Sequence, residues 1–86
     1  MWEFRWSNLK SARLKRTRGV SFEEITQWRV IDVVEHHARP EQRIVLFERK
    51  RYVWAAPCVQ GGTVLFLKTL YPSRKYTRLY RRGELT

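Results

Sequence analysis

The amino-acid sequence predicts an α+β fold in which a short strand and two helices precede an antiparallel β-meander of about four strands and a short basic helix. Three observations support this class. Helix start and stop residues gather in the first third of the chain, β-branched residues and a Gly-Gly turn occupy the middle, and a Pro-Ser step precedes the last basic segment. With no linker, repeat or low-complexity stretch, residues 1–86 are expected to form a single domain.

The N-terminus carries the signals of a strand followed by a helix. Residues 2–6 alternate large apolar with charged side chains, which is the period of a half-buried strand. Ser7 is a suitable N-cap for a helix that continues to about Arg18, and Gly19 follows in the C′ position. Because its apolar residues do not share one face, this helix is predicted mainly from its ends.

A second helix start follows directly. Ser21 and Glu24 have the spacing of a capping box, and Val20 and Ile25 stand at the two positions of a hydrophobic staple. Apolar residues continue at helical spacing, so a short helix is predicted near residues 22–29.

The middle of the chain is predicted to form the sheet. Strands are expected at residues 31–35, 43–48, 52–60 and 63–71, with a loop at residues 36–41. Gly61 and Gly62 are a strong signal for a two-residue hairpin turn. Pro57 cannot donate a ladder hydrogen bond and therefore predicts a bulge, a strand end or a sheet edge.

The last predicted strand leads into a basic helix. Pro72 ends the strand, and Ser73 begins the helix. At about 100° per residue, Tyr76 and Tyr80 fall on the side that would pack on the sheet. The cations on the opposite arc are Arg74, Lys75, Arg78, Arg81 and Arg82.

The composition favours a folded protein with an anionic partner. The hydrophobic fraction is 43%, whereas eighteen Lys and Arg against eight Asp and Glu give a net charge of +10. Such a field opposes folding and attracts phosphates, so nucleic acid is the leading partner, and an acidic protein would satisfy the same charge. Cys58 is the only cysteine, no signal-peptide core is present, and no apolar run could span a bilayer. These features predict a soluble cytoplasmic protein with no membrane partner.

Three motifs carry a resemblance to a known family. They are Phe4-x-Trp6 before a basic helix, Arg-Gly-Val-Ser-Phe-Glu-Glu at residues 18–24, and Ser-Arg-Lys-Tyr-Thr-Arg at residues 73–78. In this order and spacing, across nearly the whole chain, they resemble the BrnT family of toxins, which has the RelE-like ribonuclease fold. The resemblance implies the toxin of a type II toxin–antitoxin system, which cuts mRNA, free or on the ribosome, and so inhibits translation. It also implies a small antitoxin partner, often a ribbon-helix-helix DNA-binding protein.

The resemblance further implies RNA cleavage by the RNA's own 2′-hydroxyl, without a metal or other cofactor. That reaction needs cations at the phosphate oxygens and groups that transfer protons. The predicted cations are Lys68, Arg74, Lys75 and Arg78, and the candidate acid–base residues are His36, Tyr71 and Tyr76. The resemblance favours Arg74 for a functional role, and arginine suits it because a guanidinium can hold two phosphate oxygens at once. The competing interpretation is that the cations form only the solvated face of an amphipathic helix.

Several other residues have simpler interpretations as well. His36 and His37 are adjacent, so at most one is expected to face a site, and a solvated loop histidine is the alternative. The RNA-binding surface is predicted to include Arg49, Lys50, Arg51, Arg81 and Arg82. The first three of these also suit a solubilising turn. No Cys, His and carboxylate cluster with metal-ligand spacing occurs, so no metal site is predicted.

Two alternatives to a ribonuclease toxin follow from departures from the family pattern. Arg18 stands where the family commonly has a histidine, and Leu79 follows Arg78 where an acidic residue is often found. The first alternative is a non-catalytic RNA- or DNA-binding module that uses the same basic face. The second is a degenerate toxin retained for antitoxin binding or operon control.

Overall fold

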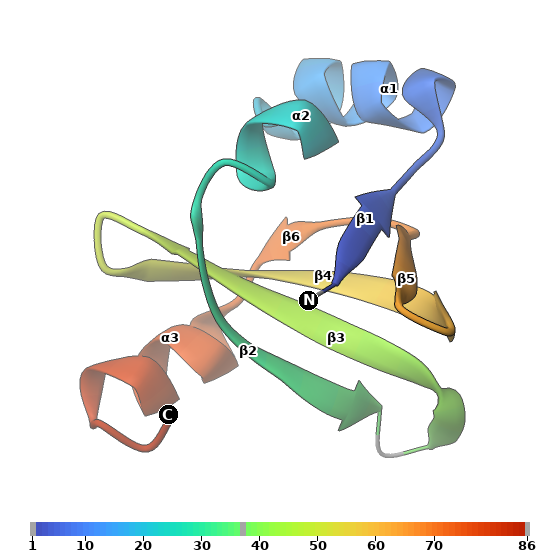
Figure 1. Ribbon diagram of the computed structural model, residues 1–86. Helices are drawn as coiled ribbons and strands as arrows, with labels where there is room; N and C mark the ends of the chain where they lie inside the picture. Colours follow the sequence, from blue (N-terminus) through green and yellow to red (C-terminus); the bar gives the residue numbers. More distant parts are fainter. Residues whose placement is uncertain (1, 37, 86) are drawn as a thin grey trace.

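A twisted sheet separates the two N-terminal helices from the C-terminal helix in the computed structural model, which describes residues 2–36 and 38–85 (Figure 1). In chain order the elements are β1 (Glu3–Arg5), α1 (Asn8–Arg18), α2 (Phe22–Ile25), β2 (Arg29–His36), β3 (Arg39–Arg49), β4 (Tyr52–Gly61), β5 (Val64–Leu67), β6 (Tyr71–Pro72) and α3 (Arg74–Arg81). The predicted α+β class and order of elements are confirmed. None of the helices in this described part of the chain is long and apolar enough to cross a membrane.

The sheet is mixed, because its first strand joins it in parallel. The strand order is β1-β5-β4-β3-β2, and β6 pairs with β4. Strands β2 to β5 form the predicted antiparallel meander. β1 runs parallel to β5, with Phe4 beside Leu65, so the beginning of the chain is joined to a strand near its end.

The helix α1 begins and ends where the sequence predicts. The Ser7 hydroxyl accepts a hydrogen bond from the Lys10 backbone N–H, and Gly19 closes the helix with φ of 80°. The contact of α1 with the rest of the domain is partly polar. Ser11 is 2% exposed, and its hydroxyl donates to the Glu23 carboxylate while it accepts from the Phe22 N–H. Together with the buried Leu14, this serine, which sequence reasoning missed, attaches a helix that has no apolar stripe.

The helix α2 has the predicted capping box but is shorter than predicted. The Ser21 hydroxyl accepts from the Glu24 backbone N–H, and the Glu24 carboxylate accepts from the Ser21 N–H. The prediction of helix near residues 22–29 is wrong beyond Ile25. Arg29 already pairs with β3, and the Trp28 ring packs edge-on against Trp54 at 5.9 Å. Sheet pairing therefore overrides the helical spacing of these residues.

The capping box predicts a dependence of stability on pH. The Lys15 hydrogen bond, followed by that of the Ser21 backbone, lowers the pKa of Glu24 from 4.5 to about 2. A carboxyl with a lowered folded-state pKa stabilises the fold above its unfolded pKa, and this contribution disappears as the pH falls through the folded pKa. We therefore expect the difference in Tm between wild type and Glu24→Gln to be widest above about pH 5. It should shrink toward pH values of about 2.

Thermal unfolding followed by circular dichroism at a series of pH values tests this expectation. Glu41→Gln is the matched control, because Glu41 is an exposed carboxylate on β3. Its Tm difference from wild type should stay small throughout. A Glu24→Gln difference that is constant down to the most acidic sample would contradict the assignment.

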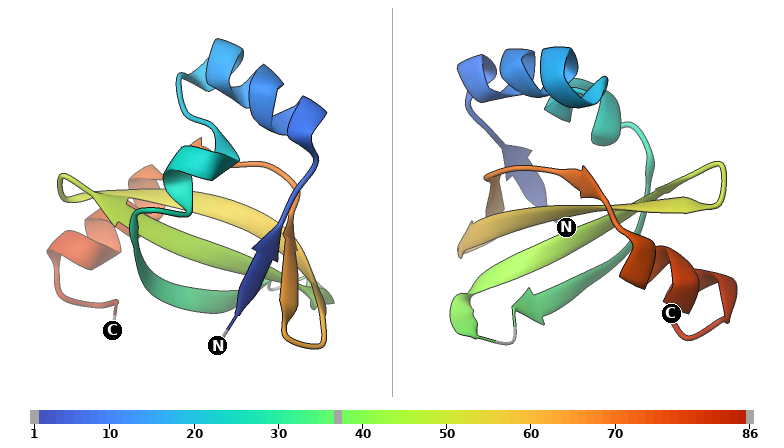
Figure 2. Two further views of the ribbon diagram at one scale, coloured as in Figure 1. Left: turned by 45° about the horizontal axis from the view of Figure 1, so that its top comes forward. Right: turned by 180° about the vertical axis from the view of Figure 1, so that it is seen from behind.

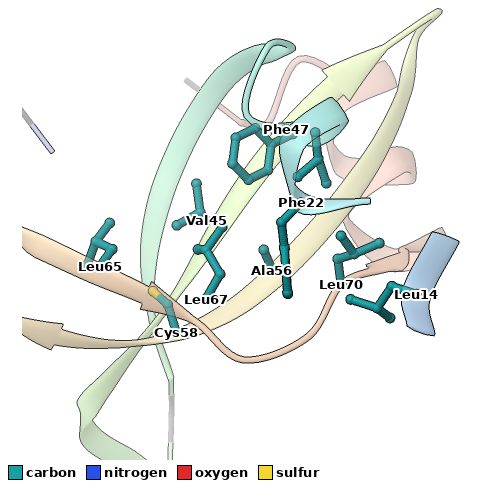
Figure 3. Packing of buried hydrophobic residues seen from close by; sticks show 10 residues of the cluster. Leu14, Phe22, Val45, Phe47, Ala56, Cys58, Leu65, Leu67 and Leu70 are labelled. Atoms are coloured by element: carbon teal, nitrogen blue, oxygen red, sulfur yellow. The ribbon is translucent and has the colours of Figure 1, made fainter. Parts of the chain in front are cut away.

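The two faces of the sheet carry separate hydrophobic clusters. The larger one lies under α1 and α2 and includes Phe22, Phe47 and Leu67, as Figure 3 shows from close by. The smaller one lies under α3 and consists of Leu46, Val53 and Ala55, with partly buried side chains packed around it. The packing of α3 on the sheet therefore rests on a small hydrophobic cluster, whereas most buried apolar residues lie on the other face.

The strand predicted at residues 63–71 is interrupted. β5 ends at Leu67, and the chain rejoins β4 only at Tyr71, opposite Ala55. The Pro57 carbonyl accepts the Lys68 N–H at 2.8 Å. In an antiparallel pair, the backbone nitrogen and carbonyl of one residue point toward the same neighbouring strand. The Pro57 nitrogen, which has no hydrogen to donate, therefore points toward the gap between β5 and β6. The predicted bulge, strand end or sheet edge at Pro57 is wrong for β4, which continues through Pro57 in regular register with β3, and the interruption lies between β5 and β6 instead.

The hairpin between β3 and β4 is tight. Lys50 and Arg51 have φ of 54° and 65°, so both central residues of the turn are left-handed. The loop predicted at residues 36–41 is shorter than expected, since β2 extends to His36 and β3 starts at Arg39.

Candidate nucleic-acid interface

Helix α3 starts at the predicted position. Ser73 has extended backbone angles, and its hydroxyl accepts a hydrogen bond from the Tyr76 N–H at 3.1 Å. Pro72 pairs with Trp54 of β4 just before this cap. The start of the helix is therefore fixed to the sheet on both sides of the turn, which determines where Arg74 lies.

Hydrogen bonds to the backbone of Val53 in β4 attach α3 to the sheet. The Thr77 hydroxyl accepts from the Val53 N–H at 2.9 Å and lies 3.4 Å from the Val53 carbonyl, to which it donates. The same carbonyl accepts the Ser73 N–H at 2.9 Å. Thr77 is 4% exposed. Sequence reasoning missed this role, although Thr77 is the small polar residue between the tyrosines on the packing side and one turn after the N-cap.

The tyrosines of α3 lie on the predicted side. Tyr76 and Tyr80 are half-buried and pack with the cluster of Leu46, Val53 and Ala55. The cations Arg74, Lys75, Arg78, Arg81 and Arg82 are all exposed. The amphipathic pattern of the helix is confirmed.

Two hollows border α3, and they share Arg74. The first, here called the arginine hollow, has a volume of about 380 Å³ and is lined by Tyr52, Arg74, Thr77, Arg78, Arg81 and Arg82. The second, here called the tyrosine hollow, has a volume of about 370 Å³ and is lined by His36, Ile44, Tyr71, Pro72, Ser73, Arg74, Lys75 and Tyr76. Each is large enough for a phosphate and part of a nucleotide.

The arginine hollow is strongly cationic. Four guanidinium groups line it, and no carboxylate does. Across residues 2–36 and 38–85, none of these four arginines forms an ion pair. The Arg81 guanidinium lies 6.0 Å from the centre of the Tyr52 ring, which holds it over an aromatic face. The charge of this hollow therefore suits an anionic ligand.

The tyrosine hollow combines cations with groups that can transfer protons. Arg74 and Lys75 line it together with the three predicted acid–base residues, which are His36, Tyr71 and Tyr76. The Nδ1 atom of His36 accepts the Ala38 N–H at 3.2 Å. The Lys75 ammonium lies 5.4 Å from the centre of the Tyr76 ring. The sequence gives no direct signal that β2, β6 and α3 meet here, because their pairing is non-local.

Other predicted site residues lie outside both hollows. Lys68 lines neither, and its ammonium is 5.1 Å from the centre of the Phe66 ring. At the β3–β4 turn, the Arg49 guanidinium lies 5.2 Å from the centre of the Trp28 ring, and the Arg51 N–H donates to the Glu48 carboxylate. Lys50 is exposed at the tip of the same turn.

Two further predictions concern histidine and cysteine. His37 is outside the described residues. Cys58 is buried, and desolvation raises the pKa of its thiol to about 11, so it behaves as an inert small hydrophobic residue. In the part of the chain that the structure describes, no three His, Cys, Asp or Glu side chains are grouped so as to hold a metal ion.

The fold and these surfaces define a small α+β protein with a cationic site on one face of its sheet. Comparison with known proteins finds no matching family model, no matching curated protein and no matching solved structure. The resemblance to BrnT toxins therefore stays a prediction.

Proposed function

We propose that this protein is a metal-independent endoribonuclease that cuts mRNA, and that it is the toxin component of a type II toxin–antitoxin system. One observation carries the proposal: Arg74 lines both hollows, so that an anion-binding surface adjoins a hollow with proton-transfer groups. A single RNA strand that follows α3 would place one phosphate at Arg74 and its neighbours at the arginine hollow.

The proposed reaction takes place in the tyrosine hollow. Arg74 and Lys75 bind the non-bridging oxygens of the scissile phosphate, which stabilises the charge that develops during the reaction. The 2′-oxygen loses its proton to a base and attacks phosphorus, while the bond from phosphorus to the 5′-oxygen breaks. An acid returns a proton to that 5′-oxygen, so the products are a 2′,3′-cyclic phosphate and a 5′-hydroxyl. His36 and Tyr71 are the proposed pair for these transfers, with Tyr76 beside them.

The proposed antitoxin is a small protein that covers this cationic face in the cytoplasm. With a net charge of +10, the chain favours an acidic binding segment, and the resemblance to BrnT toxins adds a ribbon-helix-helix part that binds DNA. Co-expression of the protein encoded by the neighbouring gene should then relieve growth arrest.

The experiment uses purified protein and a short single-stranded RNA in the presence of EDTA, with and without ribosomes. We expect fragments that end in a 2′,3′-cyclic phosphate, and we expect the RNA with a 2′-deoxy nucleotide at the cut site to remain intact. Mass spectrometry of the fragments identifies both ends. Fragments with other ends, or cleavage of the 2′-deoxy control, would contradict the mechanism.

The second candidate is a non-catalytic nucleic-acid-binding module, which includes a degenerate toxin. It is favoured by the packing of Tyr76 against the core beneath α3 and by the position of Lys75 at the Tyr76 ring. Both groups have a structural role even without a reaction. Salt-sensitive binding of RNA that stays intact, with and without ribosomes, would support this candidate over the first.

A further inference from the structure

An apolar strip leads away from the tyrosine hollow across the sheet. It consists of Ile44, Pro57, Val59 and Phe66, and Ile44 also lines that hollow. Ile44 pairs with Pro57, and Val59 pairs with Phe66, so each pair shares one face of the sheet. Because Pro57 and Val59 are two residues apart on β4, all four side chains lie on the same face.

This strip is on the side of the sheet that carries α3. Ile44 packs with the cluster of Leu46, Val53 and Ala55 beneath that helix. In Figure 2 (right), α3 lies near the β3–β4 turn, and the end of the sheet where β4 turns into β5 extends beyond it. The side chains of the strip are partly exposed, and Phe66 at its far end is 38% exposed.

Cations border the exposed ring. The Lys68 ammonium is 5.1 Å from the centre of the Phe66 ring, and Arg5 stands beside Phe66 in the parallel pairing of β1 with β5. Arg5 forms an exposed ion pair with Glu3 at 2.6 Å. An exposed aromatic ring beside a cation suits the stacking of one base of a single strand, because the cation can hold a nearby phosphate.

We propose that Phe66 is a stacking site for one base of the same single-stranded RNA that binds at Arg74 and Lys75. This inference rests on the proposed function, because it deepens the binding of the same RNA. It assigns Lys68 to the phosphate next to the stacked base, which accounts for a predicted site residue that lines neither hollow. It also restricts the substrate class, because bases within a duplex are already stacked and paired and do not offer a free face.

A nucleic acid suits this surface better than a protein segment does. The local charge is positive, and the chain as a whole carries +10. An apolar peptide would form no favourable electrostatic contact with Lys68. It would also bury the Lys68 ammonium without a partner, and that desolvation costs free energy. A protein partner on this strip remains a distinguishable outcome of the experiment below.

The test measures binding without cleavage. The probe is a short single-stranded RNA made entirely of 2′-O-methyl nucleotides, which cannot react, with 2-aminopurine at one position after another. A second probe of the same length has abasic sites in place of its bases. The variants are Phe66→Leu, which keeps an apolar side chain, and Phe66→Tyr, which keeps the ring. The matched control is Trp2→Leu, because Trp2 has an equally exposed ring at 39%.

We expect wild type and Phe66→Tyr to quench 2-aminopurine at one position and to bind the RNA with similar affinity. Phe66→Leu should lose the quenching and weaken binding of the RNA about five- to a hundredfold, as expected for one stacked base. It should bind the abasic probe as wild type does. Trp2→Leu should resemble wild type with both probes.

The outcomes separate the inference from the proposed function. If wild type binds neither probe even at low salt, the proposed function fails. If wild type binds both and Phe66→Leu is unchanged, the stacking site is wrong and the proposed function stands. Equal weakening with both probes would show that Phe66 acts on the backbone site instead of on a base. Loss of antitoxin binding in Phe66→Leu, with RNA binding intact, would assign the strip to the protein partner and overturn the inference.

Discussion

Replacement of Arg74 by alanine is expected to lower the rate of RNA cleavage by about 10²–10³-fold, as loss of one charge-stabilising donor does in other active sites. Arg74 is the only residue among those described that lines both hollows, so its removal affects the scissile phosphate and the path of the strand together. Because the side chain is exposed, the fold itself should be unaffected. The measurement is the single-turnover rate at saturating protein, with Tm as the check on folding.

Two further variants make this prediction sharper. Arg74→Lys keeps the charge but loses the planar fork, so it should recover only part of the rate. Arg16→Ala removes another exposed arginine, from α1 on the other side of the sheet, and this variant should cleave RNA as wild type does. If both Arg74 variants keep the wild-type rate, the reaction is not centred on this residue.

Replacement of Phe22 by alanine is expected to destabilise the fold by about 3–5 kcal/mol. Phe22 is fully buried, its ring lies 6.0 Å from that of Trp6, and its N–H is bonded to Ser11. A small domain has a free energy of unfolding of about 5–15 kcal/mol, so this loss is a large share of the total. Urea unfolding followed by fluorescence measures it.

The same variant tests whether the two faces of the sheet are independent. Phe22 packs on the α1 and α2 side, whereas the proposed RNA site lies on the α3 side. The fraction of Phe22→Ala that remains folded should therefore bind RNA with unchanged affinity. If the alanine variant does not fold, Phe22→Leu can be used in its place, because it should lose less of the free energy of unfolding. A loss of RNA affinity in folded Phe22→Leu protein would contradict the separation of the faces.

Local signals made much of the fold predictable. Ser7, Gly19, Ser21 and Ser73 act as caps where the sequence places them, because a cap depends only on the few residues around it. The prediction of helix to residue 29 failed because Arg29 is bound by β3, a contact that is non-local in the sequence. The parallel β1–β5 pairing escaped prediction for the same reason.

The site was predictable in its residue types and only partly in its arrangement. Arg74 and Lys75 follow from the helix start, and the structure brings them together with His36 and Tyr71. That meeting depends on how β2, β6 and α3 pack, which no local pattern specifies. The roles of Thr77 and Ser11 were missed because the residue type alone does not show whether a hydroxyl group is exposed or is buried and bonded to a neighbouring element.

The pairing of β1 with β5 also determines when the sheet can be completed during synthesis of the chain. Glu3 leaves the ribosome early, but its partner Val64 is made sixty-one positions later. At about 5–20 residues per second, roughly 3–12 s pass before the first strand has a place to bind. The segment that bears Arg74 follows later still. The surface proposed to bind RNA is therefore complete only after β5, β6 and α3 have all been synthesised.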